Sequence, residues 1–95
     1  PASLREKYDV NSYDLYSYPN PAENTLTISF KLPQKTIATI SVHDIFGNEV
    51  ITAGSNHYSA GWNKEELSVN GLKPGVYLYK MNSEKITVVQ RLVIQ

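Results

Sequence analysis

Apolar and polar residues alternate along most of this chain with a period of two, which is the pattern of β-strands that keep one side in water. The clearest case is TLTISFKL at residues 25–32, in which every second side chain is apolar. No stretch carries apolar residues at helical spacing over several turns. We therefore predict an all-β chain, with strands at residues 15–18, 24–32, 36–44, 49–53, 64–69, 76–81 and 85–94.

Turn signals separate the predicted strands. Gly47 and Asn48 can adopt positive φ and close a hairpin, and Lys73-Pro74-Gly75 and Asn82-Ser83 mark two later turns. Residues 54–63 are expected to form a longer loop. About seven short strands joined in this way predict an immunoglobulin-like antiparallel β-sandwich. An up-and-down barrel is the alternative, but it needs more strands than the chain comfortably supplies.

Two local motifs bear on how such a sandwich would be closed. Pro19 and Pro21 remove two backbone donors and favour extended conformations before them, so this segment should cross between sheets or lie at an edge. Tyr77 follows a Pro-Gly corner at the start of a late strand. It is therefore predicted to form a tyrosine corner, in which the hydroxyl group bonds back to the preceding loop.

Length and charge limit the classes of protein to consider. A chain of 95 residues fits one domain; residues 1–14 are polar and aperiodic, so they are expected to be a linker or N-terminal arm, and residues 15–95 the folded domain. Nine basic and nine acidic residues cancel, which argues against nucleic-acid binding. The apolar runs are too short for a transmembrane helix. No signal peptide is recognisable at the start, so an export signal would stand upstream, or this segment is itself part of the address.

Candidate chemistry is sparse. Cysteine is absent, which removes disulfides, thiol nucleophiles and cysteine-based zinc sites. His43 should face solvent from a strand and His57 should lie in a loop, so neither a metal site nor a cofactor is predicted. No G-x-S-x-G elbow, oxyanion loop or buried carboxylate pair is recognisable. The sequence does not predict an enzyme.

Aromatic residues leave two questions open. Trp62 could plug one end of the sandwich, which we favour because large rings are mostly buried, or it could stack on a sugar ring together with Tyr58. The tyrosines near the N-terminus could form a patch for a partner, or some of them could pack under the first strand; they are Tyr8, Tyr13, Tyr16 and Tyr18.

Taken in order, several motifs resemble the C-terminal sorting domain of type IX secretion substrates, the type A class or Por secretion tail. They are Tyr18-Pro19-Asn20-Pro21-Ala22, Asp44-Ile45-Phe46-Gly47-Asn48-Glu49-Val50, Leu72-Lys73-Pro74-Gly75-Val76-Tyr77 and the apolar end Arg91-Leu92-Val93-Ile94-Gln95. Their order, spacing and position at a chain end carry the resemblance, which covers about residues 15–95.

The resemblance implies a non-catalytic signal at the tail of a larger exported protein of a Gram-negative bacterium. Such tails fold as immunoglobulin-like sandwiches in the periplasm, meet shuttle components and the outer-membrane translocon, and are usually removed at the cell surface by a sortase-like peptidase. The cargo is then released or anchored. The residues that the family would use for recognition are Tyr18, Pro19, Asn20, Pro21, Gly75, Tyr77, Arg91, Leu92, Val93, Ile94 and Gln95.

One departure from the family pattern concerns charge. The family often ends in a lysine or a lysine pair, whereas Arg91 is the last basic residue here. We therefore expect recognition through an exposed terminal strand, whose edge can accept a partner strand, rather than through terminal charge. Two rival interpretations are an immunoglobulin-like carbohydrate- or ligand-binding module of a secreted enzyme and a structural spacer.

Overall fold

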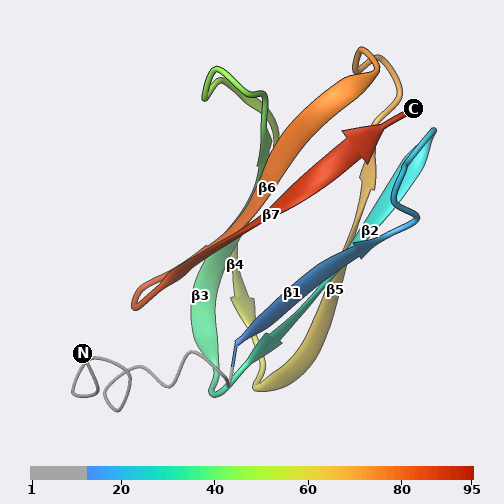
Figure 1. The fold of residues 1–95 in the computed structure, drawn as a ribbon. Helices are drawn as coiled ribbons and strands as arrows, with labels where there is room; N and C mark the ends of the chain where they lie inside the picture. The colour runs from blue at the N-terminus through green and yellow to red at the C-terminus, as the bar shows by residue number, and fades with distance from the viewer. Residues whose placement is uncertain (1–12) are drawn as a thin grey trace.

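The chain forms two antiparallel β-sheets packed face to face in a computed structural model, which describes residues 13–95 (Figure 1). Residues 1–12, which include most of the predicted arm and Tyr8, lie outside the described part. The strands are β1 (Asp14–Tyr18), β2 (Thr25–Leu32), β3 (Thr36–His43), β4 (Glu49–Tyr58), β5 (Gly61–Ser68), β6 (Gly75–Ser83) and β7 (Thr87–Ile94). The predicted all-β, seven-stranded immunoglobulin-like sandwich is confirmed.

The strands divide into a three-stranded sheet in the order β1-β2-β5 and a four-stranded sheet in the order β4-β3-β6-β7. The core lies between the sheets, because the alternating apolar residues of each strand point inward. Buried side chains come from both sheets, and the largest of them include Phe30, Leu15, Leu26, Ile28, Leu32, Ile40, Met81 and Leu92. In β3 the alternating residues Ala38, Ile40 and Val42 are buried, and in β6 the alternating residues Tyr77, Tyr79 and Met81 are buried.

The predicted loop at residues 54–63 is wrong. β4 continues to Tyr58 and β5 begins at Gly61, so the connection is short and His57 lies in a strand. This part of β4 is held by its backbone pairing to β3, with Ala38 opposite Asn56. Because β4 is the outer strand of its sheet, its exposed polar residues do not show the alternation on which the prediction relied.

The turn between the last two strands also differs from the prediction. β6 extends to Ser83 and β7 begins at Thr87, so the turn lies at residues 84–86 rather than at Asn82-Ser83. The Ser83 hydroxyl group donates to the carbonyl oxygen of Ile86 and accepts from its N–H, at 3.0 and 3.2 Å. These bonds hold the turn, which begins two residues further along the chain than the sequence pattern indicated.

Candidate recognition site

The proline segment joins β1 to β2 within the three-stranded sheet and on its way contacts β7, the last strand of the other sheet. Both the Tyr18-Pro19 and the Asn20-Pro21 peptide bonds are cis. Beyond them Ala22, which is fully buried, pairs in parallel with Ile94. The Ala22 N–H donates to the carbonyl oxygen of Val93 at 2.9 Å, and the Gln95 N–H donates to the carbonyl oxygen of Ala22 at 2.8 Å. The segment therefore joins two strands of one sheet and lies against the edge strand of the other sheet, which agrees with the predicted edge position.

The Asn20 side chain adds a third bond to this junction. Its Oδ1 atom accepts a hydrogen bond from the Val93 N–H at 3.1 Å. The outward N–H and C=O of Val93 and the outward N–H of Gln95 are thus all paired. We call this junction of residues 19–22 with residues 93–95 the C-terminal latch.

The latch covers only one end of the β7 edge. Within residues 13–95, β7 is hydrogen-bonded to β6 on one side and to no named strand on the other. Since the backbone groups of a strand point alternately to its two sides, those of Val89 and Arg91 point the same way as those of Val93. Beyond the latch, β7 therefore presents the kind of edge to which a partner strand can add.

The side chains of residues 91–95 point alternately into the core and out toward solvent. Leu92 and Ile94 are buried in the core, whereas Arg91 and Gln95 are exposed and Val93 is half-buried. The side chains of Leu92 and Ile94 are therefore part of the fold. A partner could reach the Arg91 and Gln95 side chains.

Gly75 and Tyr77 lie directly beside the latch, because they pair with Ile94 and Leu92. The Tyr77 hydroxyl group donates to the carbonyl oxygen of Lys73 at 2.7 Å, so the predicted tyrosine corner is present. Tyr77 is only 8% exposed, and its role in the fold is to fix the corner that precedes β6. Gly75 has φ +152°, a backbone conformation that favours glycine.

The structure thus brings the sequence-predicted recognition residues together at one end of the sandwich. In Figure 1 the connection between β1 and β2, the start of β6 and the C-terminus all lie at that end. A shallow hollow beside them is lined by Pro19, Pro21, Glu23, Asn24 and Thr25. Alternation and turn signals did not predict the latch itself, because its partners are far apart in the sequence.

The preferred prediction for Trp62 is wrong, because its side chain is 51% exposed. Trp62 lies on the same face of β5 as Lys64 and Glu66, and this face points away from the core. Its ring meets the Tyr16 ring edge-on, with centroids 5.6 Å apart. Together the two rings lie diagonally across β2 above Ser29, which is 1% exposed.

The N-terminal tyrosines divide between the two open interpretations. Tyr16 and Tyr18 are 46% and 40% exposed, and their rings stack with centroids 5.9 Å apart. Tyr13 is half-buried and packs against the core. Tyr16, Tyr18 and Trp62 therefore form an exposed group on the outer face of the three-stranded sheet, which we call the aromatic row.

Tyr58 does not belong to the aromatic row. It is 8% exposed, and its ring is perpendicular to that of Phe30, with centroids 4.8 Å apart. Its hydroxyl group donates to Oε1 of Glu65 at 2.7 Å. Burial, together with this bond to Glu65, raises the pKa of Tyr58 to about 12. The alternative in which Trp62 and Tyr58 together form a stacking platform is therefore wrong.

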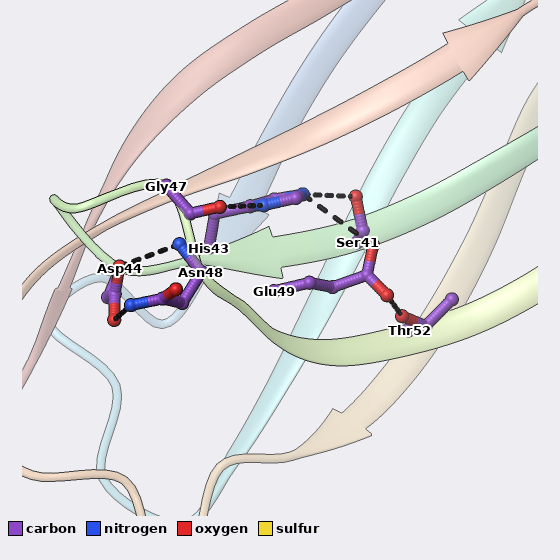
Figure 2. Close-up of polar contacts among 7 residues, drawn as sticks. All are labelled: Ser41, His43, Asp44, Gly47, Asn48, Glu49 and Thr52. Carbon is purple, nitrogen blue, oxygen red and sulfur yellow. Dashed lines mark hydrogen bonds and ion pairs between the residues drawn. The ribbon is translucent and has the colours of Figure 1, made fainter.

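A cluster of polar side chains lies at the β3–β4 hairpin, separate from the C-terminal latch and the aromatic row (Figure 2). His43 is half-buried rather than facing solvent, since its Nε2 lies 2.9 Å from the hydroxyl group of Ser41 and its Nδ1 lies 3.5 Å from the carbonyl oxygen of Gly47. Glu49 Oε1 is 3.8 Å from His43 Nε2. Within residues 13–95, no group of three or more His, Cys, Asp or Glu residues is arranged to hold a metal ion.

Comparison with known proteins identifies the family. The model of the "Secretion system C-terminal sorting domain" matches residues 16–95, and no curated protein matches the chain. Among solved structures, the sulfur carrier protein SoxY from Chlorobium limicola f thiosulfatophilum is similar, with 15% identity and a TM-score of 0.49 over 99% of this chain and 94% of that one. No helix in residues 13–95 is long and apolar enough to cross a membrane. The chain belongs to the family of type IX secretion C-terminal sorting domains.

Proposed function

We propose that this domain directs a larger cargo protein through the type IX translocon and that the end of the sandwich bearing the C-terminal latch is the surface that the secretion machinery reads. The cargo would pass through the periplasm and reach the cell surface or the medium. No bond is made or broken by the domain in this account. Removal of the domain would be the work of a sortase-like surface peptidase.

The observation that carries this proposal is the contact between the proline segment and the last strand. Asn20 and Ala22 bind the backbone of Val93 and Gln95, while Gly75 and Tyr77 lie on the neighbouring strand. A receptor can therefore meet all of these segments on one preformed surface. Binding a preformed surface costs little conformational entropy.

The free part of the β7 edge offers one way to bind. A strand of the translocon or of a shuttle component could pair with the outward backbone groups near Val89 and Arg91. Backbone pairing supplies affinity without a terminal lysine, and Arg91 would contribute a single charge beside it. The latch would fix where the added strand ends, because the groups beyond Arg91 are already paired.

A secretion assay with a fused reporter tests the proposed function. A reporter with an inner-membrane export signal and residues 1–95 at its C-terminus should reach the surface of a type IX-competent cell. It should remain in the periplasm of a translocon mutant. Delivery to the surface of the mutant would contradict the proposal.

One observation favours a second candidate function, the binding of a carbohydrate. The aromatic row presents exposed Trp62, Tyr16 and Tyr18 rings on one face, and rings of this kind can stack on sugars. The row lies on the three-stranded sheet, so substitutions there can be tested separately from the latch.

A further inference from the structure

The turn that joins β3 to β4 is fixed almost entirely by Asp44 and the backbone. Asp44 Oδ1 accepts from the N–H groups of Phe46 and Asn48 at 2.9 Å each, and Oδ2 accepts from the Asn48 side-chain amide at 3.1 Å. The backbone adds bonds from Asp44 N–H to Asn48 and from Gly47 N–H to Asp44, at 2.9 and 3.1 Å. Figure 2 shows how the Asp44 and Asn48 side chains close the turn, which Gly47 allows by adopting φ +90°.

This fixed turn exposes two large apolar side chains. Ile45 is 66% exposed and Phe46 is 84% exposed, which makes them the most exposed large apolar residues among those that the structure describes. Neither side chain forms part of the core, and the bonds that hold the turn use only the backbone of Phe46. The fold therefore has no evident need for apolar residues at these two positions.

The turn lies at the same end of the sandwich as the C-terminal latch. His43, the last residue of β3, pairs with Leu78 of β6, and Leu78 pairs with Arg91 of β7. Figure 1 shows the β3–β4 turn and the C-terminus at this common end, at the two opposite edges of the four-stranded sheet. One receptor that faces this end could contact both features.

We propose that Ile45 and Phe46 form an apolar anchor that inserts into a pocket of the same protein receptor that reads the latch; this inference rests on the proposed function. A rigid turn presents the anchor without an ordering cost, and an aromatic residue that fills a pocket is a frequent centre of binding energy. The anchor protrudes, so it fits a concave partner.

The charge around the anchor favours a protein pocket over a membrane surface. Residues 36–63 contain no lysine or arginine, and the carboxylates of Asp44 and Glu49 flank the anchor. One basic side chain from a neighbouring strand, Lys80, lines a hollow beside the hairpin together with His43 and Glu49. The turn therefore lacks the group of several basic residues beside the apolar ones on which peripheral membrane sites depend. A pocket with a positively charged rim complements the anchor in both apolar character and charge.

Three variants of the full reporter fusion test the anchor. Ile45→Ser/Phe46→Ser removes the apolar side chains, and Phe46→Leu keeps an apolar one. Ile37→Thr replaces an exposed apolar residue outside the turn, near the start of β3. The Ile45→Ser/Phe46→Ser domain, called the Ser/Ser variant below, should keep its melting temperature within about 4 °C, because exposed substitutions change stability little. Its surface delivery should fall by about tenfold or more, as expected for loss of a binding anchor, while Phe46→Leu and Ile37→Thr retain delivery.

Two outcomes separate this inference from the proposed function. If wild-type delivery requires the translocon and the Ser/Ser variant is delivered normally, the anchor is wrong and the sorting function stands. If wild-type delivery does not require the translocon, the sorting function itself fails.

Two further measurements on the purified domain test whether the anchor binds a protein receptor rather than a membrane or a second copy of the domain. Flotation with vesicles of phosphatidylethanolamine and phosphatidylglycerol, or with lipopolysaccharide, should show no binding. Light scattering after size exclusion should show a monomer. Vesicle binding or dimerisation that disappears in the Ser/Ser variant would overturn the assignment to a receptor pocket.

Discussion

The Oδ1 atom of Asn20 accepts a hydrogen bond from the backbone N–H of Val93, at 3.1 Å and across 73 residues of sequence. It joins the proline segment to the end of the last strand, next to the backbone bonds of Ala22. The C-terminal residues of a domain are usually poorly ordered unless something holds them. Here the proline segment holds them, so the two family motifs form one structural unit.

Substitution of Asn20 tests the latch directly. Asn20→Ala removes the acceptor for the Val93 N–H, and the loss of one hydrogen bond should lower the free energy of unfolding by about 1 kcal/mol. The melting temperature should fall by about 4–8 °C. Hydrogen exchange of the Val93 amide should become faster, whereas Asn20→Asp, which keeps an acceptor oxygen, should leave it protected. Equal exchange in wild type and Asn20→Ala would contradict the latch.

The tyrosine corner makes a separate prediction. Tyr77→Phe removes the bond from the hydroxyl group to the carbonyl oxygen of Lys73 and leaves the ring in place. Unfolding in urea should show a loss of about 1 kcal/mol. The matched control is Tyr18→Phe, since Tyr18 is 40% exposed, and it should change stability by less than about 0.5 kcal/mol. Similar losses in the two variants would argue against the corner.

The β3–β4 turn predicts a dependence of stability on pH. Hydrogen bonds from Asn48, first of all from its side-chain amide, lower the pKa of Asp44 from its ordinary value of 3.8. A group whose pKa is lower in the folded state stabilises the fold above its unfolded pKa, and this contribution disappears as the pH falls through the folded pKa. The difference in melting temperature between wild type and Asp44→Asn should thus be constant above about pH 5 and shrink toward pH 2. A difference that does not change with pH would contradict this role of Asp44.

The exposure of Trp62 determines how much stability the Trp62→Ala substitution should cost. Deletion of a buried ring costs about 3–5 kcal/mol, but Trp62 keeps half of its surface in water and contacts the Tyr16 ring. We expect a loss of about 0.5–1.5 kcal/mol, the scale of an aromatic pair, and a folded protein. Glycan arrays with the folded variant and wild type then test the second candidate function, because a carbohydrate that binds only the wild type would support it.

Local patterns were sufficient to predict much of the fold. The alternation of β2 placed its apolar residues in the core correctly, and the Pro-Gly corner before Tyr77 correctly indicated a bond to the preceding loop. Each of these features is encoded within a few neighbouring residues. The family motifs also pointed to residues that lie beside one another at the end of the sandwich, and their role in recognition stays a prediction.

Features that depend on distant pairing could not be predicted from local pattern. The Asn20–Val93 bond joins segments that are 73 residues apart in the sequence, and the polar part of β4 is a strand because β3 lies beside it. Trp62 was misplaced because its strand has polar residues on both faces: the inward Glu65 is satisfied by the buried hydroxyl group of Tyr58. The signal that could have placed Trp62 correctly is the alternation along β5. Leu67 points into the core, so Glu66, Lys64 and Trp62 must lie on the opposite face of the strand.

Deletion of residues 91–95 is a poor test of recognition, although the terminal strand is a proposed signal. The deletion removes Leu92 and Ile94, which are 0% and 2% exposed. Truncation of a single buried leucine or isoleucine costs about 2–5 kcal/mol, and a small domain has only about 5–15 kcal/mol of stability. Loss of export would then report unfolding, so a substitution that keeps the core is required.

The central claim is that the C-terminal latch is read by the secretion machinery, and surface delivery of two matched variants tests it most directly. Asn20→Ala breaks a hydrogen bond in the latch, and Ser83→Ala breaks the side-chain bonds of the β6–β7 turn at the opposite end. Reporter fusions of both should be compared at a temperature at which both domains are folded. The account predicts that Ser83→Ala is delivered like wild type and that Asn20→Ala stays in the periplasm. Equal delivery of the two variants would contradict it.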